Sequence, residues 1–257
     1  MDKRWIYKNK GNPETINHLA EALGVERVLA TLLVQRGIST FDEAKKFFRP
    51  SLEDLYNPFL MKDMQAAVER IERAIRGNER ILVYGDYDVD GTTAVALIYS
   101  FLQKRYSKIG YYIPDRYNEG YGISLKGIDY AAENGYSLVI ALDCGIKANE
   151  KVAYAQSRRI DFIICDHHLP GDQIPQAVAV LDPKRPDCKY PFKELSGCGV
   201  GFKLLQAYCQ KNGTNMEELY QYLDLVAVSI ASDIVPVIDE NRVLSFYGLQ
   251  KLNVNPS

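Results

Sequence analysis

Three short apolar segments of this chain each run into an acidic cluster, and this arrangement constrains the fold more than any other feature. Residues 80–84 (RILVY) lead into GDYDVDG, residues 138–142 (LVIAL) lead into DCG, and residues 161–165 (DFIIC) lead into DHH. Apolar runs of about five residues without polar alternation are typical of strands that are covered on both faces. The three segments are therefore predicted to be buried strands.

Helical patterns separate these strands along the chain. Two further short strands are predicted at 109–113 and 177–181. The predicted helices of this part are 92–105, 125–134, 148–158, 199–211 and 216–232. Strands that alternate with helices form parallel sheets, because each crossover helix returns the chain to the same end of the sheet. We therefore expect an α/β fold, a parallel sheet with helices on both faces.

The first 78 residues follow a different pattern, which predicts an N-terminal helical region packed on the core. The helices expected there are 15–23, 25–36, 43–48 and 64–76. Gly24 and Gly37 follow the first two helices at positions typical of helix ends. The segment 39–43 (STFDE) has the spacing of a capping box. We accordingly divide the chain into a helical region, 1–78, and a core domain, 79–257.

Composition limits the classes of function. The chain has 31 Lys and Arg against 33 Asp and Glu, a net charge of −2, which excludes a general polyanion binder of the histone type. The best candidate for a membrane span, 223–238, is interrupted by Asp224, Asp233 and Pro236, so no membrane association is expected. The five cysteines form no C-x-x-C pair, and the N-terminus lacks a signal-peptide pattern. These features indicate a cytoplasmic protein.

The acidic clusters at the strand ends predict a metal site. The carboxyl ends of parallel strands meet at one edge of a sheet, where open α/β folds bind ligands. The side chains expected at that edge are Asp86, Asp88, Asp90, Asp143, Asp166, His167 and His168. Crowded carboxylates repel one another, and a cation relieves the repulsion. Carboxylate and imidazole ligands suit Mn²⁺ or Mg²⁺ rather than a thiolate-bound zinc.

Each of these motifs also has a simpler interpretation when taken alone. An Asp-x-Asp-x-Asp loop can cap a helix, Asp143 can be a helix N-cap residue, and a histidine pair can lie on the surface by chance. The combination favours a metal cluster, because two of the three histidines in the chain follow a strand end beside an acid. The helix starts at Gly91-Thr92 and at Gly199 offer amides to a phosphate. A tight packing turn explains the Gly199 segment equally well.

Four ordered motifs resemble those of the DHH phosphoesterase superfamily. They are DYDVDG at 86–91, DCG at 143–145, DHH at 166–168 and SDIVP at 232–236. Within the superfamily the GDYDVDG form is similar to the RecJ-like exonucleases, and less so to the nanoRNases and cyclic-dinucleotide phosphodiesterases. The resemblance covers nearly the whole chain. It implies a metal-dependent phosphodiesterase with a DHH-like fold, a 5′→3′ exonuclease on single-stranded DNA in repair and recombination.

The resemblance also implies two divalent cations, Mn²⁺ or Mg²⁺. The implied ligands are Asp86 and Asp88 for one ion, Asp90, His167 and Asp233 for the other, and Asp143 between the two. Many members carry a histidine four residues before the middle aspartate of the first motif, where this chain has Tyr84. The first site would then bind its ion more weakly, or be completed by Asp86 and water.

The same resemblance assigns His168 to the scissile phosphate and Asp166 to a supporting position behind the histidines. Arg116 and Tyr121 are candidates for substrate contact, with a structural turn as the alternative. RecJ-like proteins continue with a substrate-binding domain and an OB-fold, which nothing in this sequence matches. A single-strand-binding protein or a helicase would bind through those regions.

Two other functions remain open at this point. One is a phosphodiesterase of short oligonucleotides or cyclic dinucleotides. The other is a metal-free scaffold like the replication factor of the same ancestry. The presence of all the acids and both histidines argues against the scaffold.

Overall fold

The computed structural model describes residues 4, 6, 9 and 11–257. The chain forms two compact units that divide between Glu53 and Asp54. This division lies earlier than the one expected after residue 78, because helix α4 (Met64–Arg76) belongs to the second unit. The buried Arg70 of α4 donates hydrogen bonds to two acids beside the sheet. These are Asp161 Oδ2 at 2.6 Å and Glu79 Oε2 at 2.6 Å.

The first unit contains three short helices, α1 (Pro13–Leu23), α2 (Arg27–Val34) and α3 (Phe41–Phe48). The predicted capping box is present at α3, where Thr40 and Glu43 exchange side-chain and backbone hydrogen bonds. A small apolar core joins the helices; its buried members are Ile16, Leu19, Ala30, Leu33 and Ala44. Two 3₁₀ turns, η1 (Leu52–Asp54) and η2 (Pro58–Leu60), follow along the chain.

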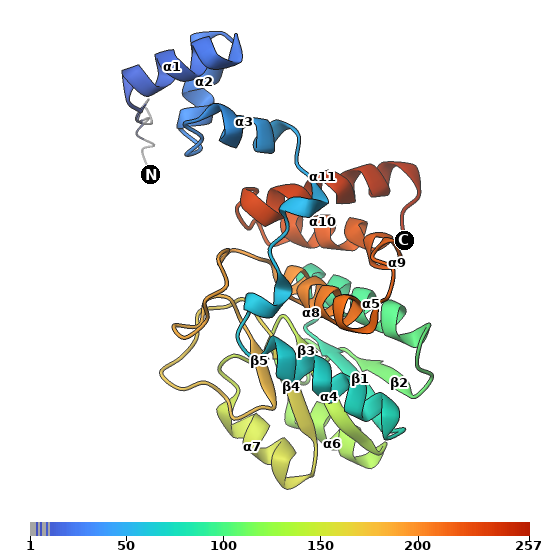
Figure 1. Ribbon diagram of the computed structural model, residues 1–257. Coiled ribbons are helices and arrows are strands. Elements are labelled where there is room, and N and C mark those ends of the chain that lie inside the picture. The colour runs from blue at the N-terminus through green and yellow to red at the C-terminus, as the bar shows by residue number, and fades with distance from the viewer. Residues whose placement is uncertain (1–3, 5, 7–8, 10) are drawn as a thin grey trace. The chain divides into compact units, whose positions relative to one another are not determined.

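The second unit is built on a five-stranded sheet in the order β2-β1-β3-β4-β5 (Figure 1). The strands are β1 (Arg80–Gly85), β2 (Ile109–Tyr112), β3 (Tyr136–Leu142), β4 (Asp161–Cys165) and β5 (Ala179–Leu181). Every neighbouring pair is parallel, so the predicted fold class is confirmed. The strand order reverses between β1 and β3, and a ligand crevice forms at such a point in open α/β sheets.

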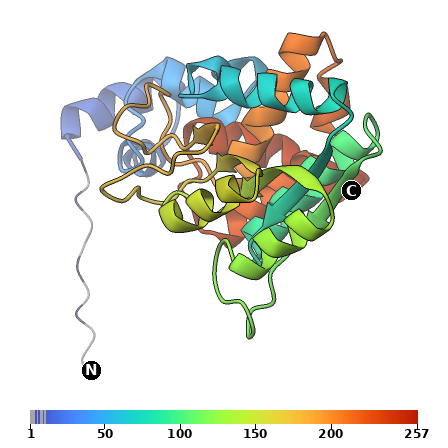
Figure 2. The same ribbon diagram turned by 90° about the horizontal axis from the view of Figure 1, so that it is seen from below.

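Helices cover both faces of the sheet. One face carries α4, α5 (Val89–Gln103) and α8 (Gly197–Asn212), and α8 contacts both of the others. The other face carries α6 (Leu125–Glu133) and α7 (Asn149–Ser157), which lie in front of the strands in Figure 2. Alternate strand residues face each layer, so β1, β3, β4 and β5 are buried on both sides, whereas the edge strand β2 is only partly buried. This explains the apolar runs in the sequence.

The helices depart most from the sequence expectation in three places. Helix α5 begins at Val89 rather than residue 92, because the Asp88 carboxylate accepts a bond from Gly91 N at 2.9 Å and so caps the helix. The helix expected at 216–232 is two, α9 (Glu217–Tyr220) and α10 (Leu223–Ser232). The chain then forms α11 (Asp239–Val254), which the sequence did not predict as a helix. Within the described part of the chain, every helix is too short or too polar to span a bilayer.

Candidate metal centre

The predicted acids and histidines meet at the carboxyl edge of the sheet, beside the β1–β3 switch point. The loops that carry them continue the strand ladder: Asp143 N donates to Cys165 O at 2.8 Å, and Asp166 N donates to Leu181 O at 2.9 Å. Asp143 itself has a left-handed backbone, with φ of 60°. These bonds hold the ends of β3, β4 and β5 in register, so the side chains that follow the strands converge.

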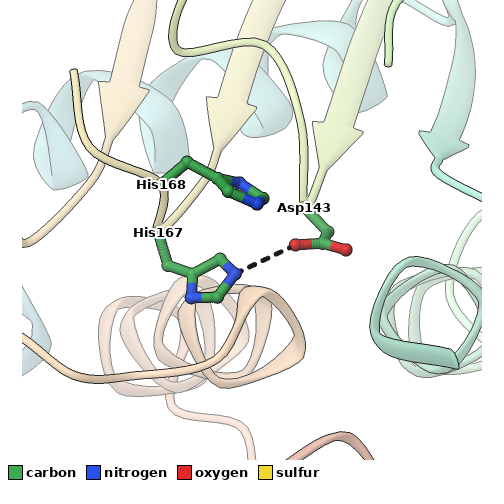
Figure 3. A group of neighbouring side chains, drawn as sticks. All are labelled: Asp143, His167 and His168. Carbon is green, nitrogen blue, oxygen red and sulfur yellow. Dashed lines mark ion pairs between the residues drawn. The ribbon is translucent and has the colours of Figure 1, made fainter. Parts of the chain in front are cut away.

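His167 lies at the centre of this arrangement. Its Nε2 is 3.2 Å from Asp143 Oδ1, 3.6 Å from Asp233 Oδ2 and 3.7 Å from Asp90 Oδ2. Figure 3 shows the imidazole directed at the Asp143 carboxylate. Among the described residues, two sets have ligand atoms within 4.8 Å of one another, and His167 belongs to both. The sets are Asp143, His167 and His168, and Asp90, His167 and Asp233.

The atoms at this centre fit a divalent cation. Both ring nitrogens of His167 and Oδ1 of Asp143 are buried and have no hydrogen-bond partner. Burial, together with the charges of Asp90 and Asp88, raises the pKa of Asp143 to about 10. A carboxylate that resists ionisation beside an unpartnered imidazole is stabilised by a cation, which satisfies both groups.

Asp90 is held in place by the start of helix α8. Its Oδ1 accepts from Cys198 N at 2.7 Å and from Ser229 Oγ at 2.8 Å, and its Oδ2 accepts from Gly197 N at 2.7 Å. A side chain at position 197 would lie 2.6 Å from Asp143 Oδ1, so only glycine fits between the two acids. The helix amides thus bind an acid of the chain itself, and they orient it toward His167.

Asp86 and Asp88 reach the same edge but belong to neither set. Asp86 is fully buried, and its two oxygens accept from Tyr87 N at 2.7 Å and Gly122 N at 3.1 Å. Asp88 caps α5. Tyr84, where the resemblance implies a histidine in many members, donates its hydroxyl to Gly122 O at 2.9 Å and is buried. Tyr84 is therefore a structural residue of the sheet.

His168 is oriented by Asp166. The His168 Nδ1 lies 2.7 Å from Asp166 Oδ1, which also accepts from the backbone amides of both histidines. Burial alone would raise the pKa of Asp166, but the hydrogen bonds and the charge of His168 lower it below its ordinary value. The same bond raises the pKa of His168. On its other side, His168 Nε2 is 3.2 Å from the Tyr121 hydroxyl.

Arg116 and Tyr121 also lie at this edge. Both contact the ring of Tyr87, a residue that the sequence analysis did not single out. The Arg116 guanidinium lies 5.2 Å above the ring of Tyr87, and the Tyr87 and Tyr121 rings meet edge to face at 6.2 Å. Tyr121 and His168 line a pocket of about 290 Å³, together with Lys147 and Lys151. The pocket thus brings cationic side chains beside the acidic cluster.

The helix starts that were expected to bind phosphate have partners within the chain. Gly91 N donates to Asp88, and the Thr92 hydroxyl donates to Asp88 O at 2.6 Å. Gly199 N donates to Ser196 Oγ at 3.1 Å. These bonds occupy the amides of Gly91 and Gly199 in the substrate-free chain, and phosphate binding at Gly91, Thr92 and Gly199 stays a prediction.

One further buried acid was missed, although its signal was present. Asp182 follows β5 as Asp143 follows β3, so the rule of acids at strand ends applies to it. Its Oδ1 accepts from Lys184 N at 2.7 Å, whereas its Oδ2 is buried without a partner. Ser229, by contrast, contacts Asp90 from within an apolar helix, and nothing in the local sequence marks it.

Comparison with known proteins identifies the class. Residues 80–230 match the DHH family, N-terminal domain. The chain therefore belongs to the DHH family. The match includes three of the four motifs and all the ligand candidates except Asp233.

Within this family the chain is similar to RecJ proteins. It is 41% identical over 249 residues to the single-stranded-DNA-specific exonuclease RecJ of Bacillus subtilis, an alignment that covers 97% of this chain and 31% of that protein. Crystal structures of Thermus thermophilus RecJ in complex with Mn²⁺ and with Mg²⁺ have TM-scores of 0.77 and 0.65, at 28% and 26% identity. Each alignment covers 94% of this chain, but 34% and 30% of the respective RecJ chains. The chain thus spans about a third of the length of these relatives.

Proposed function

We propose that this chain is a metal-dependent phosphodiesterase that hydrolyses single-stranded DNA from its 5′ end. One observation carries the proposal: His167 joins two sets of ligand atoms, and its ring nitrogens and Asp143 Oδ1 are buried without partners. The name of the Bacillus subtilis relative, a single-stranded-DNA-specific exonuclease, supports this substrate.

We assign two divalent cations, Mn²⁺ or Mg²⁺, to this site. Asp90, His167 and Asp233 would hold one, Asp86 and Asp88 the other, and Asp143 would serve both. When bound, such ions lower the pKa of water and neutralise charge on phosphate oxygens. The chain itself supplies the fixed carboxylates, which the α8 amides and the loop backbone hold in place before substrate arrives.

His168 belongs to one of the two ligand sets, but we assign it to the substrate, because its Nδ1 lies against Asp166 and its Nε2 against the Tyr121 hydroxyl. Asp166 accepts the Nδ1 proton, so Nε2 points to the pocket. The raised pKa of His168 favours the protonated ring, which can donate to a phosphate oxygen or to the departing 3′ oxygen. Asp166 thus orients the acid and stabilises its charge.

The end of the strand would lie against Tyr121, Tyr87 and Arg116. Aromatic rings stack on bases without regard to sequence, and a guanidinium binds phosphate. Lys147 and Lys151 line the same pocket and add positive charge for a polyanion. We propose that mononucleotides are released there.

We further propose a role in DNA repair and recombination in the cytoplasm. All five cysteines are free and buried, which is typical of a reducing compartment. We propose a single-strand-binding protein or a helicase as a partner, bound through regions that nothing in this sequence matches.

The test compares substrates at matched phosphodiester concentration. The chain is incubated with Mn²⁺ and either a long single strand with a 5′ phosphate, the same strand blocked at its 5′ end, a dinucleotide, or a cyclic dinucleotide. We expect Mn²⁺-dependent release of mononucleotides from the unblocked strand, and none in EDTA. Cleavage of the dinucleotides alone favours a small-substrate phosphodiesterase, and Mn²⁺ binding with no cleavage of any substrate contradicts the enzyme. Failure to bind Mn²⁺ favours the metal-free scaffold.

A further inference from the structure

Asp182 follows the strand that lies next to the one leading into His167, a proposed metal ligand. Strands β4 and β5 pair Cys165 with Leu181, so Asp166 and Asp182 are the next residues of the two strands. The bond from Asp166 N to Leu181 O keeps the strands together at this point. Neighbouring parallel strands are about 4.8 Å apart, which places Asp182 next to the loop that carries His167.

His167 and Asp182 have complementary unsatisfied atoms. The Nε2 of His167 faces Asp143, Asp90 and Asp233, and its Nδ1 points away from Asp143 (Figure 3). This Nδ1 is buried without a partner, and so is Oδ2 of Asp182, whose side chain is fully buried. Burial raises the pKa of Asp182, and the charge of the nearby His167 ring acts in the opposite direction.

A histidine that binds a metal through Nε2 carries its proton on Nδ1, and that proton needs an acceptor. Carboxylates commonly take this position behind metal-bound histidines, where they fix the tautomer and the ring orientation. We infer that Asp182 is a positioning residue for His167, its Oδ2 accepting the Nδ1 proton directly or through one buried water. This inference rests on the proposed metal-binding function, and it goes beyond it by assigning a role to an acid outside the four motifs.

The first test measures Mn²⁺ binding by calorimetry on protein stripped with EDTA. Asp182→Leu removes the acceptor, and we expect a loss of affinity of about 10- to 100-fold. Asp182→Asn keeps a carbonyl oxygen, so its loss should be smaller than that of Asp182→Leu. Asp187→Asn is the matched control, because Asp187 lies in the same loop and pairs with Arg185; its affinity should equal that of the wild type. Equal affinity in wild type and Asp182→Leu overturns the inference.

The second test uses the conservative variant Asp182→Asn and observes the His167 ring directly. The chain has three histidines, so long-range proton–nitrogen spectra of the Mg²⁺-loaded protein are readily assigned with His167→Ala and His168→Ala. We expect His167 to carry its proton on Nδ1, and we expect this resonance to shift in Asp182→Asn while that of His168 stays in place. A proton on Nε2, or an unchanged His167 resonance in Asp182→Asn, rejects the assignment. A wild-type protein that binds neither ion instead rejects the proposed function itself.

Discussion

Asp166 Oδ1 lies 2.7 Å from Nδ1 of His168. The adjacent His167, by contrast, has no hydrogen-bond partner on either ring nitrogen. Two adjacent histidines therefore have opposite environments. His168 is oriented by the Asp166 carboxylate and lines a pocket. The Nε2 of His167 instead faces the carboxylates of Asp90, Asp143 and Asp233. This difference predicts different roles.

Replacing each histidine separately should distinguish those roles. His167→Ala should weaken Mn²⁺ binding, and excess Mn²⁺ should restore part of the activity because the other ligands remain. His168→Ala should lower kcat by about 10²- to 10⁴-fold while Mn²⁺ binding stays near wild type. Calorimetry and steady-state kinetics measure both effects. The same loss of Mn²⁺ affinity in the two variants would contradict the division.

Asp143→Ala should abolish Mn²⁺-dependent cleavage, since this carboxylate is proposed to serve both ions. The fold should remain, because the substitution removes an acid whose pKa is raised by burial and by neighbouring carboxylates. Asp143→Asn, which keeps the volume, should behave in the same way. Circular dichroism and urea unfolding of the metal-free variants check the fold, and retained activity would reject the assignment.

The stability of the metal-free protein should fall as the pH rises. Burial raises the pKa of Asp182 to about 7 from the ordinary 3.8, and burial with neighbouring charges raises that of Asp143 to about 10. The folded chain therefore binds more protons than the unfolded chain, and the slope of the unfolding free energy with pH is negative. The contribution is complete below pH 3.8 and is lost as the pH passes about 7 for Asp182 and about 10 for Asp143.

Urea unfolding between pH 5 and 9 in EDTA measures this slope. Each proton that the folded chain binds in excess of the unfolded chain changes the free energy of unfolding by at most about 1.4 kcal/mol per pH unit. Asp182→Asn removes one titrating group, so its curve should be flatter than that of the wild type below about pH 7. Parallel curves for the two proteins would show that Asp182 ionises normally.

The Tyr121 hydroxyl should contribute to catalysis through His168, whose Nε2 is 3.2 Å away. Tyr121→Phe keeps the ring and removes this contact, so we expect kcat/KM to fall about fivefold, the value of one net hydrogen bond. Tyr117→Phe, on an exposed side chain of the same loop, should have no effect. In a double-mutant cycle, Tyr121→Phe should cost nothing further once His168→Ala is present. Additive losses of kcat/KM in the double variant would show that Tyr121 acts independently of His168.

The buried ion pair between Lys203 and Glu240, which lies outside the site, should contribute strongly to the free energy of unfolding. Lys203 Nζ lies 2.9 Å from Glu240 Oε1 and donates to Tyr56 O at 2.7 Å, and both charged side chains are fully buried. Lys203→Met leaves the Glu240 charge without its partner and should cost about 3–5 kcal/mol in urea unfolding. Lys211→Met removes more exposed ion pairs to Glu69 and Glu72 and should cost less than about 1 kcal/mol. Similar losses in the two variants would contradict the importance of burial.

The sequence by itself determined the strands and the identity of most acids at their ends. Apolar runs and helical periodicity are local patterns, and parallel strands necessarily bring their carboxyl ends to one edge. For this reason the approach of Asp143 to His167 could be predicted without coordinates. Asp182 could have been found by the same rule, because it follows a predicted strand.

Only the tertiary structure decided how the acids are held and which of them meet. Asp233 was identified through family resemblance, since locally it resembles Asp224, another acid of the same segment. In the fold Asp233 lies 3.6 Å from His167, whereas Asp224 bonds to Ser257. Likewise, the bond from Ser229 to Asp90 joins residues 139 apart in the chain. Contacts over such separations depend on how α8 and α10 pack on α5, and no local pattern of residues specifies that packing.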